Sequence, residues 1–398
     1  MNNNLPSIIQ CSSNSKCFYI LDEILFIGND KGFVEIFDWK KENKIFEIDL
    51  YSNKDLIENK EKDNNKQIIN INLLSKEKFD FLIQSRGGEI FIGNIDIKNL
   101  KYKQYNKIET QIESFTKFKI CFNEEIRKSN KKYVEDFKNE NWKFSIITPN
   151  EKENEIKIYE ISNNYLVLHG YIKKLFFSKE EENNDSDSDS SDNENAEIRK
   201  SLICNIIIKE SKNIIIFAFE SSTIGIYNLK LEHISHLKLF KEKEEAIITT
   251  SLFEFNNEIF ICVGFFSPNL LILKLSKDYK LISKYKNIKN ACSDLKQGIS
   301  SIIYGEGKRE DLLSEENEIN KFNLLFIGSY DKRVKLFNLN KENNEITFTD
   351  IGNIITNSNG IINQIYFLSS KEKENELNIN YYLFVCCEQR LFYIYLIA

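Results

Sequence analysis

The sequence has few of the residues that mark metal and catalytic sites. Its 3 histidines and 8 cysteines show no metal-ligand spacing and no Cys-x-x-Cys pair, which favours buried, reduced thiols. His233 and His236 are expected on opposite faces of a strand. Arg86-Gly87-Gly88 suits a hairpin turn more than a phosphate loop, and no Gly-x-Ser-x-Gly elbow occurs. We therefore expect no catalytic residue, no metal and no cofactor.

Long apolar runs and net positive charge are missing as well. No segment is apolar for the length that a bilayer requires, and the first residues do not form a signal peptide. The formal net charge of -6 argues against a general nucleic-acid binder, because phosphates attract a basic field. The expectation is a soluble protein of the nucleus, the cytoplasm or both, which binds neither nucleic acid directly nor membrane.

Proline is scarce, with 3 residues, whereas the 30 Phe and 18 Tyr are abundant, and this mixture suits β-strands. One phrase recurs, in which an apolar run is followed by a polar turn and then by alternating apolar residues. It stands at 25–39 as Leu-Phe-Ile-Gly-Asn-Asp-Lys-Gly-Phe-Val-Glu-Ile-Phe-Asp-Trp, and at 325–339 as Leu-Phe-Ile-Gly-Ser-Tyr-Asp-Lys-Arg-Val-Lys-Leu-Phe-Asn-Leu. Each copy predicts a buried strand that reverses at a tight turn and pairs with a half-buried strand.

Repetition of such hairpins at a period of about 40–60 residues indicates blades packed side by side around an axis. We therefore predict an all-β, seven-bladed β-propeller that forms a single domain over residues 1–398, each blade having four strands, a to d. The blades are expected at residues 16–50, 67–108, 114–172, 202–240, 246–285, 298–351 and 361–397. The last blade is one strand short, so residues 7–11 are predicted to supply it and to cover an open sheet edge. Trimming either end should then destabilise the fold.

The hairpins resemble the WD40 repeat in a degenerate form. Where that family has Trp-Asp at the end of strand c, this chain has Phe37-Asp38, Tyr159-Glu160, Tyr227-Asn228 and Phe337-Asn338. The family's Gly-His dipeptide is absent, and with it the Asp-His-Ser/Thr-Trp hydrogen-bond network. Apolar packing is therefore expected to hold the blades together.

Over its whole length the chain also resembles the ASTRA-associated protein 1 family, whose animal members are called guanine nucleotide-binding protein subunit beta-like protein 1. The resemblance rests on residues 144–149 followed by 154–159, on 327–337, and on a final hairpin at 383–392. It implies a non-enzymatic subunit that works with the Tel2–Tti co-chaperone assembly in the maturation of phosphatidylinositol-3-kinase-related kinases. In fungi it implies a link to chromatin through the ASTRA complex. It implies no GTP binding, because Gβ-type propellers do not themselves hold the nucleotide.

Two alternatives stay open at this point. One is a WD40 adaptor in another complex, for RNA processing, trafficking or ubiquitin ligation. The other is a propeller enzyme with its site on the central axis, which the lack of inward-pointing His, Asp and Glu sets disfavours. In the main interpretation the protein is a monomeric propeller within a larger complex.

In a WD40 propeller the b–c turns and the links between blades share one rim, which is the usual partner-binding face. Charged and aromatic side chains at such turns suit a protein interface, although ordinary solvated turns are the alternative for any one of them. The candidate partner-binding residues are Asp30, Lys31, Arg86, Tyr330, Asp331, Lys332, Arg333 and Arg390.

An acidic segment is inserted between blades three and four. Residues 179–197 contain Asp-Ser-Asp-Ser-Asp-Ser-Ser-Asp at 185–192 and have little to bury, so we expect disorder. Ser186 and Ser191 each have an acidic residue three positions on, which is a weak phosphorylation pattern. The segment is either a phospho-dependent tether for a basic partner or a tolerated insertion.

Overall fold

The computed structural model describes residues 5–52, 65–76, 78–110, 116–121, 142–150, 155–162, 167–175, 201–240, 245–288, 298–310, 319–342, 345–355, 360–371 and 379–397. Within these ranges, 28 strands form seven four-stranded sheets, and the one-turn 3-10 helix η4 (Glu210–Lys212) follows β14. The chain divides into two compact units, which we describe separately: Met1–Asn53 with Gly264–Leu270 and Ile288–Ala398 (unit 1), and Lys54–Val263 with Leu271–Asn287 (unit 2). The predicted acidic insertion at 179–197, with Ser186 and Ser191, lies outside the described residues.

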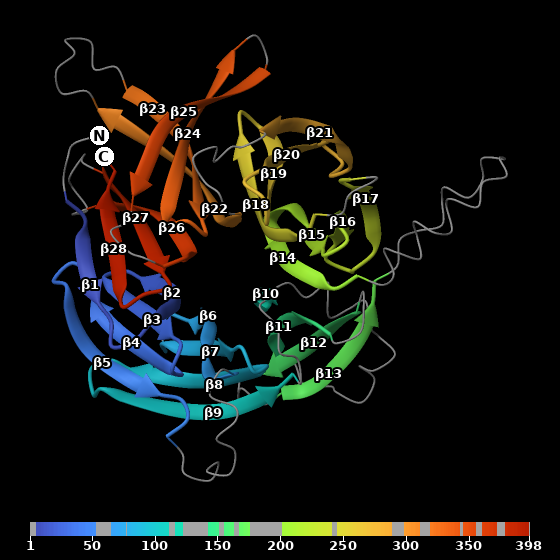
Figure 1. Cartoon of the computed structure of the whole chain (residues 1–398). Helices are drawn as coiled ribbons and strands as arrows, with labels where there is room; N and C mark the ends of the chain where they lie inside the picture. Colours follow the sequence, from blue (N-terminus) through green and yellow to red (C-terminus); the bar gives the residue numbers. More distant parts are fainter. Residues whose placement is uncertain are drawn as a thin grey trace. The chain divides into compact units, whose positions relative to one another are not determined.

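Unit 1 holds three blades (Figure 1). Blade one has β2 (Ser15–Leu21), β3 (Ile24–Asn29), β4 (Phe33–Asp38) and β5 (Asn43–Asp49). Blade six has β22 (Ile299–Glu310), β23 (Ile319–Ser329), β24 (Arg333–Glu342) and β25 (Glu345–Ile355). Blade seven has β26 (Ile362–Lys371), β27 (Ile379–Cys387), β28 (Leu391–Leu396) and β1 (Ser7–Gln10).

Unit 2 holds the other four blades, except that residues 264–270 and Ile288 of blade five belong to unit 1. Blade two has β6 (Ile68–Ser75), β7 (Asp80–Ser85), β8 (Glu89–Asp96) and β9 (Lys101–Glu109). Blade three has β10 (Lys119–Cys121), β11 (Trp142–Pro149), β12 (Glu155–Ser162) and β13 (Val167–Lys174). Blade four has β14 (Ile203–Lys209), β15 (Ile214–Phe219), β16 (Thr223–Asn228) and β17 (His233–Lys238). Blade five has β18 (Ile247–Phe255), β19 (Glu258–Phe265), β20 (Leu270–Leu275) and β21 (Leu281–Ile288).

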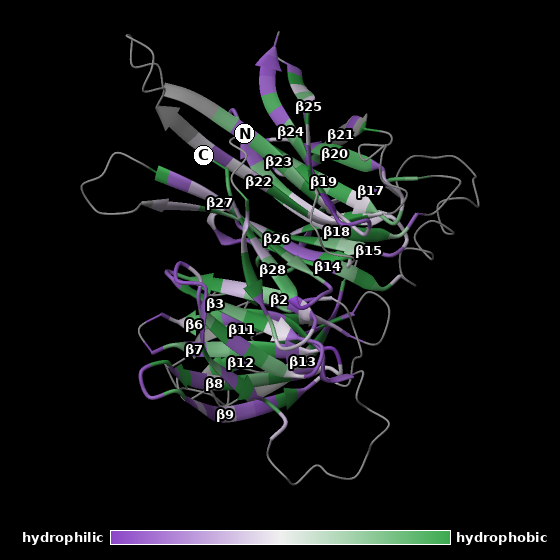
Figure 2. Cartoon of the chain, turned by 60° about the vertical axis from the view of Figure 1, so that its left-hand side comes forward, coloured by the Kyte–Doolittle hydropathy of each residue, from purple (hydrophilic) through white to green (hydrophobic). Residues whose placement is uncertain are grey.

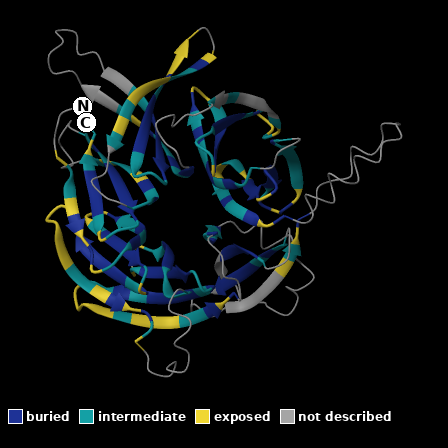
Figure 3. Cartoon of the chain, viewed as in Figure 1, coloured by how far each residue is buried: buried dark blue, intermediate teal, exposed yellow. Residues whose placement is uncertain are grey.

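Burial decreases from the middle to the outer strand of a blade. In blade two every residue of β7 is buried, whereas most of β9 is exposed or half-buried (Figure 3). The outer strand is also the hydrophilic one, with Lys101, Lys103 and Lys107 along its length (Figure 2). Each blade therefore runs from buried core strands to a solvated outer strand.

The N-terminal strand completes the last blade, as predicted. β1 pairs antiparallel with β28, with Ser7 opposite Ile394 and Gln10 opposite Leu391. Ile9 packs among Phe384, Phe392 and Ile394, in a core cluster that extends into blade one. Residues far apart in the sequence thus share one sheet and one core.

Strand a of blade six is longer than expected. The sequence suggested an end at residue 304, before Gly305-Glu306-Gly307, but β22 continues to Glu310. The two glycines leave room for aromatic rings: a Cβ on Gly305 would lie 2.5 Å from Cδ1 of Phe367, and one on Gly307 would meet the ring of Phe322. These glycines therefore permit close packing in mid-strand, where a strand end had been inferred.

Strand a of blade three is shorter than expected. The prediction ran from 114 to 122, and the structure gives β10 the three residues Lys119–Cys121. Before this strand, Thr116 Oγ1 donates a hydrogen bond of 2.8 Å to the Ile203 carbonyl of blade four.

The expected separation of His233 and His236 is wrong. The register of β16 and β17 shifts between Ile226 and Tyr227, which face Ser235 and His233, so Ile234 forms a bulge. The extra residue turns both rings to the same side, with Nδ1 of His236 3.2 Å from Nε2 of His233. Equivalent c–d shifts occur in other blades, for example between Ile36 and Phe37.

This histidine pair predicts a loss of stability in acid. Burial, and then the neighbouring His236, lower the pKa of His233 to about 4, below its ordinary 6.5. The unfolded chain therefore binds the proton more readily between those values, so the free energy of unfolding should fall as the pH drops through this window. For a half-buried ring we expect about 1–2 kcal/mol after solvent screening. Denaturant titrations of wild type and His233→Gln from pH 7 to pH 4 should show a flatter pH dependence in the variant, and parallel profiles would contradict this assignment.

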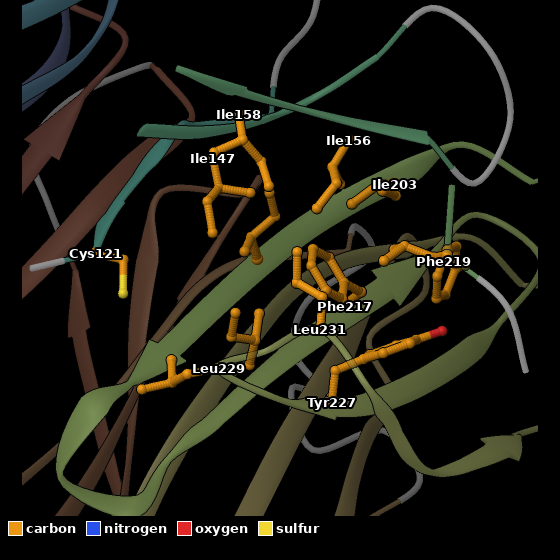
Figure 4. Packing of buried hydrophobic residues seen from close by; sticks show 13 residues of the cluster. Cys121, Ile147, Ile156, Ile158, Ile203, Phe217, Phe219, Tyr227, Leu229 and Leu231 are labelled. Carbon is orange, nitrogen blue, oxygen red and sulfur yellow. The ribbon is translucent and has the colours of Figure 1, made fainter. Parts of the chain in front are cut away.

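Large buried side chains fill the space between neighbouring blades of unit 2. One cluster joins Ile147, Ile156 and Ile158 of blade three to Phe217 and Tyr227 of blade four (Figure 4). Apolar packing was expected to hold the blades, and here it does.

Polar clamps also join the blades, so the expectation of apolar packing alone was incomplete. In unit 2, Phe118 N–H donates to Gln84 Oε1 at 2.9 Å, and Gln84 Nε2 donates to the Thr116 carbonyl at 3.2 Å. In unit 1, Gln364 Nε2 donates to the Phe18 carbonyl at 3.2 Å, and Gln364 Oε1 accepts from the Phe18 N–H at 3.4 Å. A glutamine amide satisfies backbone groups of the next blade in both cases, without the WD40 histidine.

Candidate interaction rim

The b–c turns of unit 1 are short and internally bonded. In blade one, Asn29 Oδ1 accepts hydrogen bonds of 3.0 Å from the N–H groups of Lys31 and Phe33, while Gly32 has φ 88°. Blade six places Lys332 at the position of Gly32, with φ 78°. A lysine there is strained, because L-residues disfavour this region.

Backbone contacts connect these turns with the entries to the blades. Ser15 N–H donates to the Gln389 carbonyl at 3.0 Å, and Ser15 Oγ to the Cys387 carbonyl at 2.7 Å. The N–H of Asp30 donates to the Asn14 carbonyl at 3.0 Å. The turns of blades seven and one thus meet around residues 14–15, at the same end of unit 1.

Blade six joins the same edge through its own entry. Tyr330 N–H donates to the Gly298 carbonyl at 3.1 Å, and a Cβ on Gly328 would lie 2.8 Å from a methyl group of Ile362 in blade seven. Six of the eight predicted residues therefore lie in turns of unit 1, and Arg333 begins β24 of the same unit. We call the b–c turns of this unit, residues 30–32, 266–269, 330–332 and 388–390 with Arg333 at the start of β24, the unit 1 rim.

Acidic and basic side chains differ in how the rim holds them. Asp30 accepts a hydrogen bond of 2.9 Å from Asn14 Nδ2, and Glu388 is bonded to Lys16. Lys31 and Arg390 are exposed. The acidic groups are thus engaged within the protein, while these two cations face solvent.

Asp331, unlike Lys31 and Arg390, is half-buried in its turn. Burial raises the pKa of its carboxyl group, and the Ser329 hydroxyl and the charge of Arg333 oppose that shift. Its Oδ1 is buried without a hydrogen-bond partner among the described residues. Asp331 therefore shapes the turn between Tyr330 and Lys332, which are both half-buried.

An aromatic pair with one exposed ring is the rim feature that the sequence reasoning missed. Phe266 is 69% exposed, and its ring centroid lies 6.1 Å from that of Tyr330. The carbonyl of Phe266 also packs against Gly298, where a Cβ would clash with it. A signal was present in Phe265-Phe266, because the strand ends at the buried Phe265 and the second phenylalanine falls in the b–c turn.

Arg86 lies in unit 2 and is described by itself. It follows β7 in the b–c turn of blade two, as predicted, and is half-buried. Its N–H donates to the Gln67 carbonyl at 2.7 Å, while Gly88, with φ 83°, completes the turn. The turn geometry for which the glycines were cited is therefore present.

The cysteines fit the interpretation of buried thiols. All seven cysteines in the described ranges are free, and six of them are buried, with Cys204 half-buried. No group of three or more His, Cys, Asp or Glu side chains in the described ranges is placed to hold a metal ion. Among the same residues, no helix is long and apolar enough to cross a membrane.

Solved structures resemble this chain in fold. No family model matches the sequence, and no curated protein matches it. The β-propeller domain of Cps50 (Swd1) from Myceliophteria thermophila superposes with a TM-score of 0.60 at 12% identity, over 99% of this chain and 100% of that chain. Saccharomyces cerevisiae Sqt1 gives 0.57 at 11% identity, over 100% of both chains. Chaetomium thermophilum Raptor gives 0.57 at 10% identity, over 98% of this chain and 28% of that one.

Likeness at such identities establishes the fold and nothing finer. The predicted all-β, WD40-like seven-bladed β-propeller is confirmed. The resemblance to the ASTRA-associated protein 1 family stays a prediction, as do the binding roles of the rim residues.

Proposed function

We propose that this protein is a non-enzymatic WD40-like adaptor that binds a protein partner on the unit 1 rim. The observation that carries the proposal is the exposed ring of Phe266, whose centroid lies 6.1 Å from that of the half-buried Tyr330, in the same hairpin as the basic residues Lys332 and Arg333. Aromatic and arginine side chains dominate the energetics of protein interfaces, and a large exposed ring is unfavourable until it is covered. The outward-facing Lys31 and Arg390 favour a partner surface with acidic groups.

We propose further that the adaptor acts as the ASTRA-associated subunit does, with the Tel2–Tti co-chaperones in the assembly of phosphatidylinositol-3-kinase-related kinases, in the nucleus and the cytoplasm. Support comes from where the family-like segments fall. Residues 327–337 form the β23–β24 hairpin, which carries Tyr330 to Arg333, and residues 383–392 form the β27–β28 hairpin, which carries Arg390. Two of the segments thus contain rim residues. An adaptor in RNA processing, trafficking or ubiquitin ligation is the alternative.

The test is affinity purification of the tagged full chain from its native cell, followed by mass spectrometry at moderate salt. We compare wild type with Phe266→Ala/Tyr330→Ala and with Arg390→Glu. Tyr105→Ala is the matched control, because this tyrosine is exposed on the outer strand β9. Losing two interface aromatics typically costs about 2–4 kcal/mol, so we expect partner recovery to fall at least about tenfold in the double variant and to be unchanged in the control.

The outcomes separate the two levels of the proposal. Tel2, Tti subunits or immature kinases that are lost with the rim variants would support both levels. A different complex lost with the same variants would keep the adaptor and retire the ASTRA-type role. Partners retained in full by both rim variants would refute the rim as the binding surface. Circular dichroism of each variant shows whether it is folded.

A further inference from the structure

The outer strand of blade six differs from the other long outer strands. Outer strands expose a sheet edge, and lysine side chains along an edge discourage pairing with another chain. β5, β9, β13, β17 and β21 each carry at least one lysine, whereas β1 is only four residues long. β25 has 11 residues and neither lysine nor arginine. Its sequence, Glu-Ile-Thr-Phe-Thr-Asp-Ile-Gly-Asn-Ile-Ile, is rich in β-branched residues, which favour strand pairing.

The acidic residues of β25 protect its edge poorly. Asp350 is bonded to Lys335 on the neighbouring strand β24, so its charge is compensated within the sheet. Thr349 is exposed, and Ile351 is 44% exposed. Glu345, at the start of the strand, is the other acidic residue.

A bulge limits the regular part of this edge to six residues. Phe337 faces Asp350 and Leu336 faces Gly352, so Ile351 is the extra residue. From Glu345 to Asp350 the pairing with β24 is continuous. A strand added to β25 would therefore extend the sheet along residues 345–350.

We propose that β25 pairs antiparallel with β25 of a second copy of this chain. In a two-fold antiparallel pair, residues face each other only when their positions are both odd or both even, because the inward and outward hydrogen bonds alternate along a strand. Glu345 and Asp350 differ in parity, so the two acids cannot face each other across such a pair. Centred on Phe348, the pair places Thr347 opposite Thr349, a favourable cross-strand combination.

The contact predicted is weak and reversible. A single edge of six residues buries less than about 1,000 Å² in total, which is typical of transient association. We expect a dissociation constant of roughly 10–100 µM, with monomer at low concentration. The contact involves the outer strand of blade six and no residue of the unit 1 rim.

The test is sedimentation analysis of the purified full chain between about 1 and 300 µM. Wild type is expected to dimerise over this range, Thr349→Lys to weaken the dimer at least about tenfold, and Gln104→Lys to leave it unchanged. Gln104 is the matched control, since it is exposed on the outer strand β9 and gains the same charge. A wild type that stays monomeric up to the highest concentration would overturn the proposal, even if the edge of β25 binds a different protein. So would a folded Thr349→Lys that dimerises as tightly as wild type.

A second measurement needs no variant. Hydrogen exchange of wild type at low and high concentration should show slower exchange in β25 at high concentration, while β5 and β9 stay unchanged. Equal exchange of β25 at both concentrations, in a sample that sedimentation shows to be dimeric, would place the contact elsewhere and refute the proposal.

Discussion

Removal of residues 1–11 is expected to destabilise blade seven and to make the protein aggregate. The deletion takes away β1, its pairing with β28, and the buried Ile9 and Cys11 of the core cluster. β28, Leu-Phe-Tyr-Ile-Tyr-Leu, would then be the outermost strand of its sheet. A six-residue segment without charge and with high β-propensity is prone to pair with other chains. Light scattering and thermal unfolding of the truncated protein measure both effects.

A matched pair of point variants separates burial from the simple presence of the strand. Ile9 is 2% exposed and Ile8 is 41% exposed, although they are neighbours on β1. Ile9→Ala should lower the free energy of unfolding by about 2–5 kcal/mol, because it leaves a cavity beside Phe392. Ile8→Ala should change it by less than about 1 kcal/mol. The deletion should cost more than Ile9→Ala.

Two results would contradict this account. If Ile8→Ala and Ile9→Ala cost the same, β1 would not present one face to the core. If the truncated protein stayed soluble and unfolded at the wild-type denaturant concentration, β1 would not be an essential strand of blade seven.

Local pattern was enough to predict the hairpins. The strand expected at 270–275 is β20 (Leu270–Leu275), because its apolar run and its turns are local signals. The missing fourth strand of blade seven followed from counting strands, and the pairing of Ser7 with Ile394 confirms it.

The features that were missed depend on contacts between distant residues. The bulge at Ile234 changes which side chains meet, and nothing in the strand's own alternation marks it. Gly305 signals a strand end unless Phe367, 62 positions later, is known to fill the space above it.

Local sequence also misplaces a charged side chain on strand c at two equivalent sites of unit 1. Glu35 of β4 and Lys335 of β24 are both buried, and each is bonded to strand d, Glu35 to Lys44 and Lys335 to Asp350. Lys44 and Asp350 occupy matching positions, opposite Phe37 and Phe337 just past the bulge. Blades one and six thus use one ion pair with its signs exchanged. Read alone, Val-Glu-Ile and Val-Lys-Leu suggest a polar side chain directed to solvent.

Glu35 does more than neutralise Lys44. Its carboxylate accepts from the Ser12 N–H at 3.1 and 3.0 Å, from Ser12 Oγ at 3.0 Å and from Asn29 Nδ2 at 3.2 Å. Ser12 lies in the link between β1 and β2, and Asn29 is the residue that organises the b–c turn of blade one. One carboxylate therefore fixes both the N-terminal link and a rim turn.

Glu35→Ala is therefore expected to cost about 1–3 kcal/mol, because it leaves the buried Asn29 amide and the Ser12 N–H without their acceptor. Glu47→Ala is the matched control, since Glu47 bonds to the same Lys44 at 2.7 Å but is 38% exposed, and it should cost less than about 1 kcal/mol. Lys44→Met should fall between them, because Glu35 would keep Ser12 and Asn29 as donors. Denaturant titration gives the three values. If Glu35→Ala cost no more than Glu47→Ala, the buried carboxylate would not be what holds the N-terminal link to the rim.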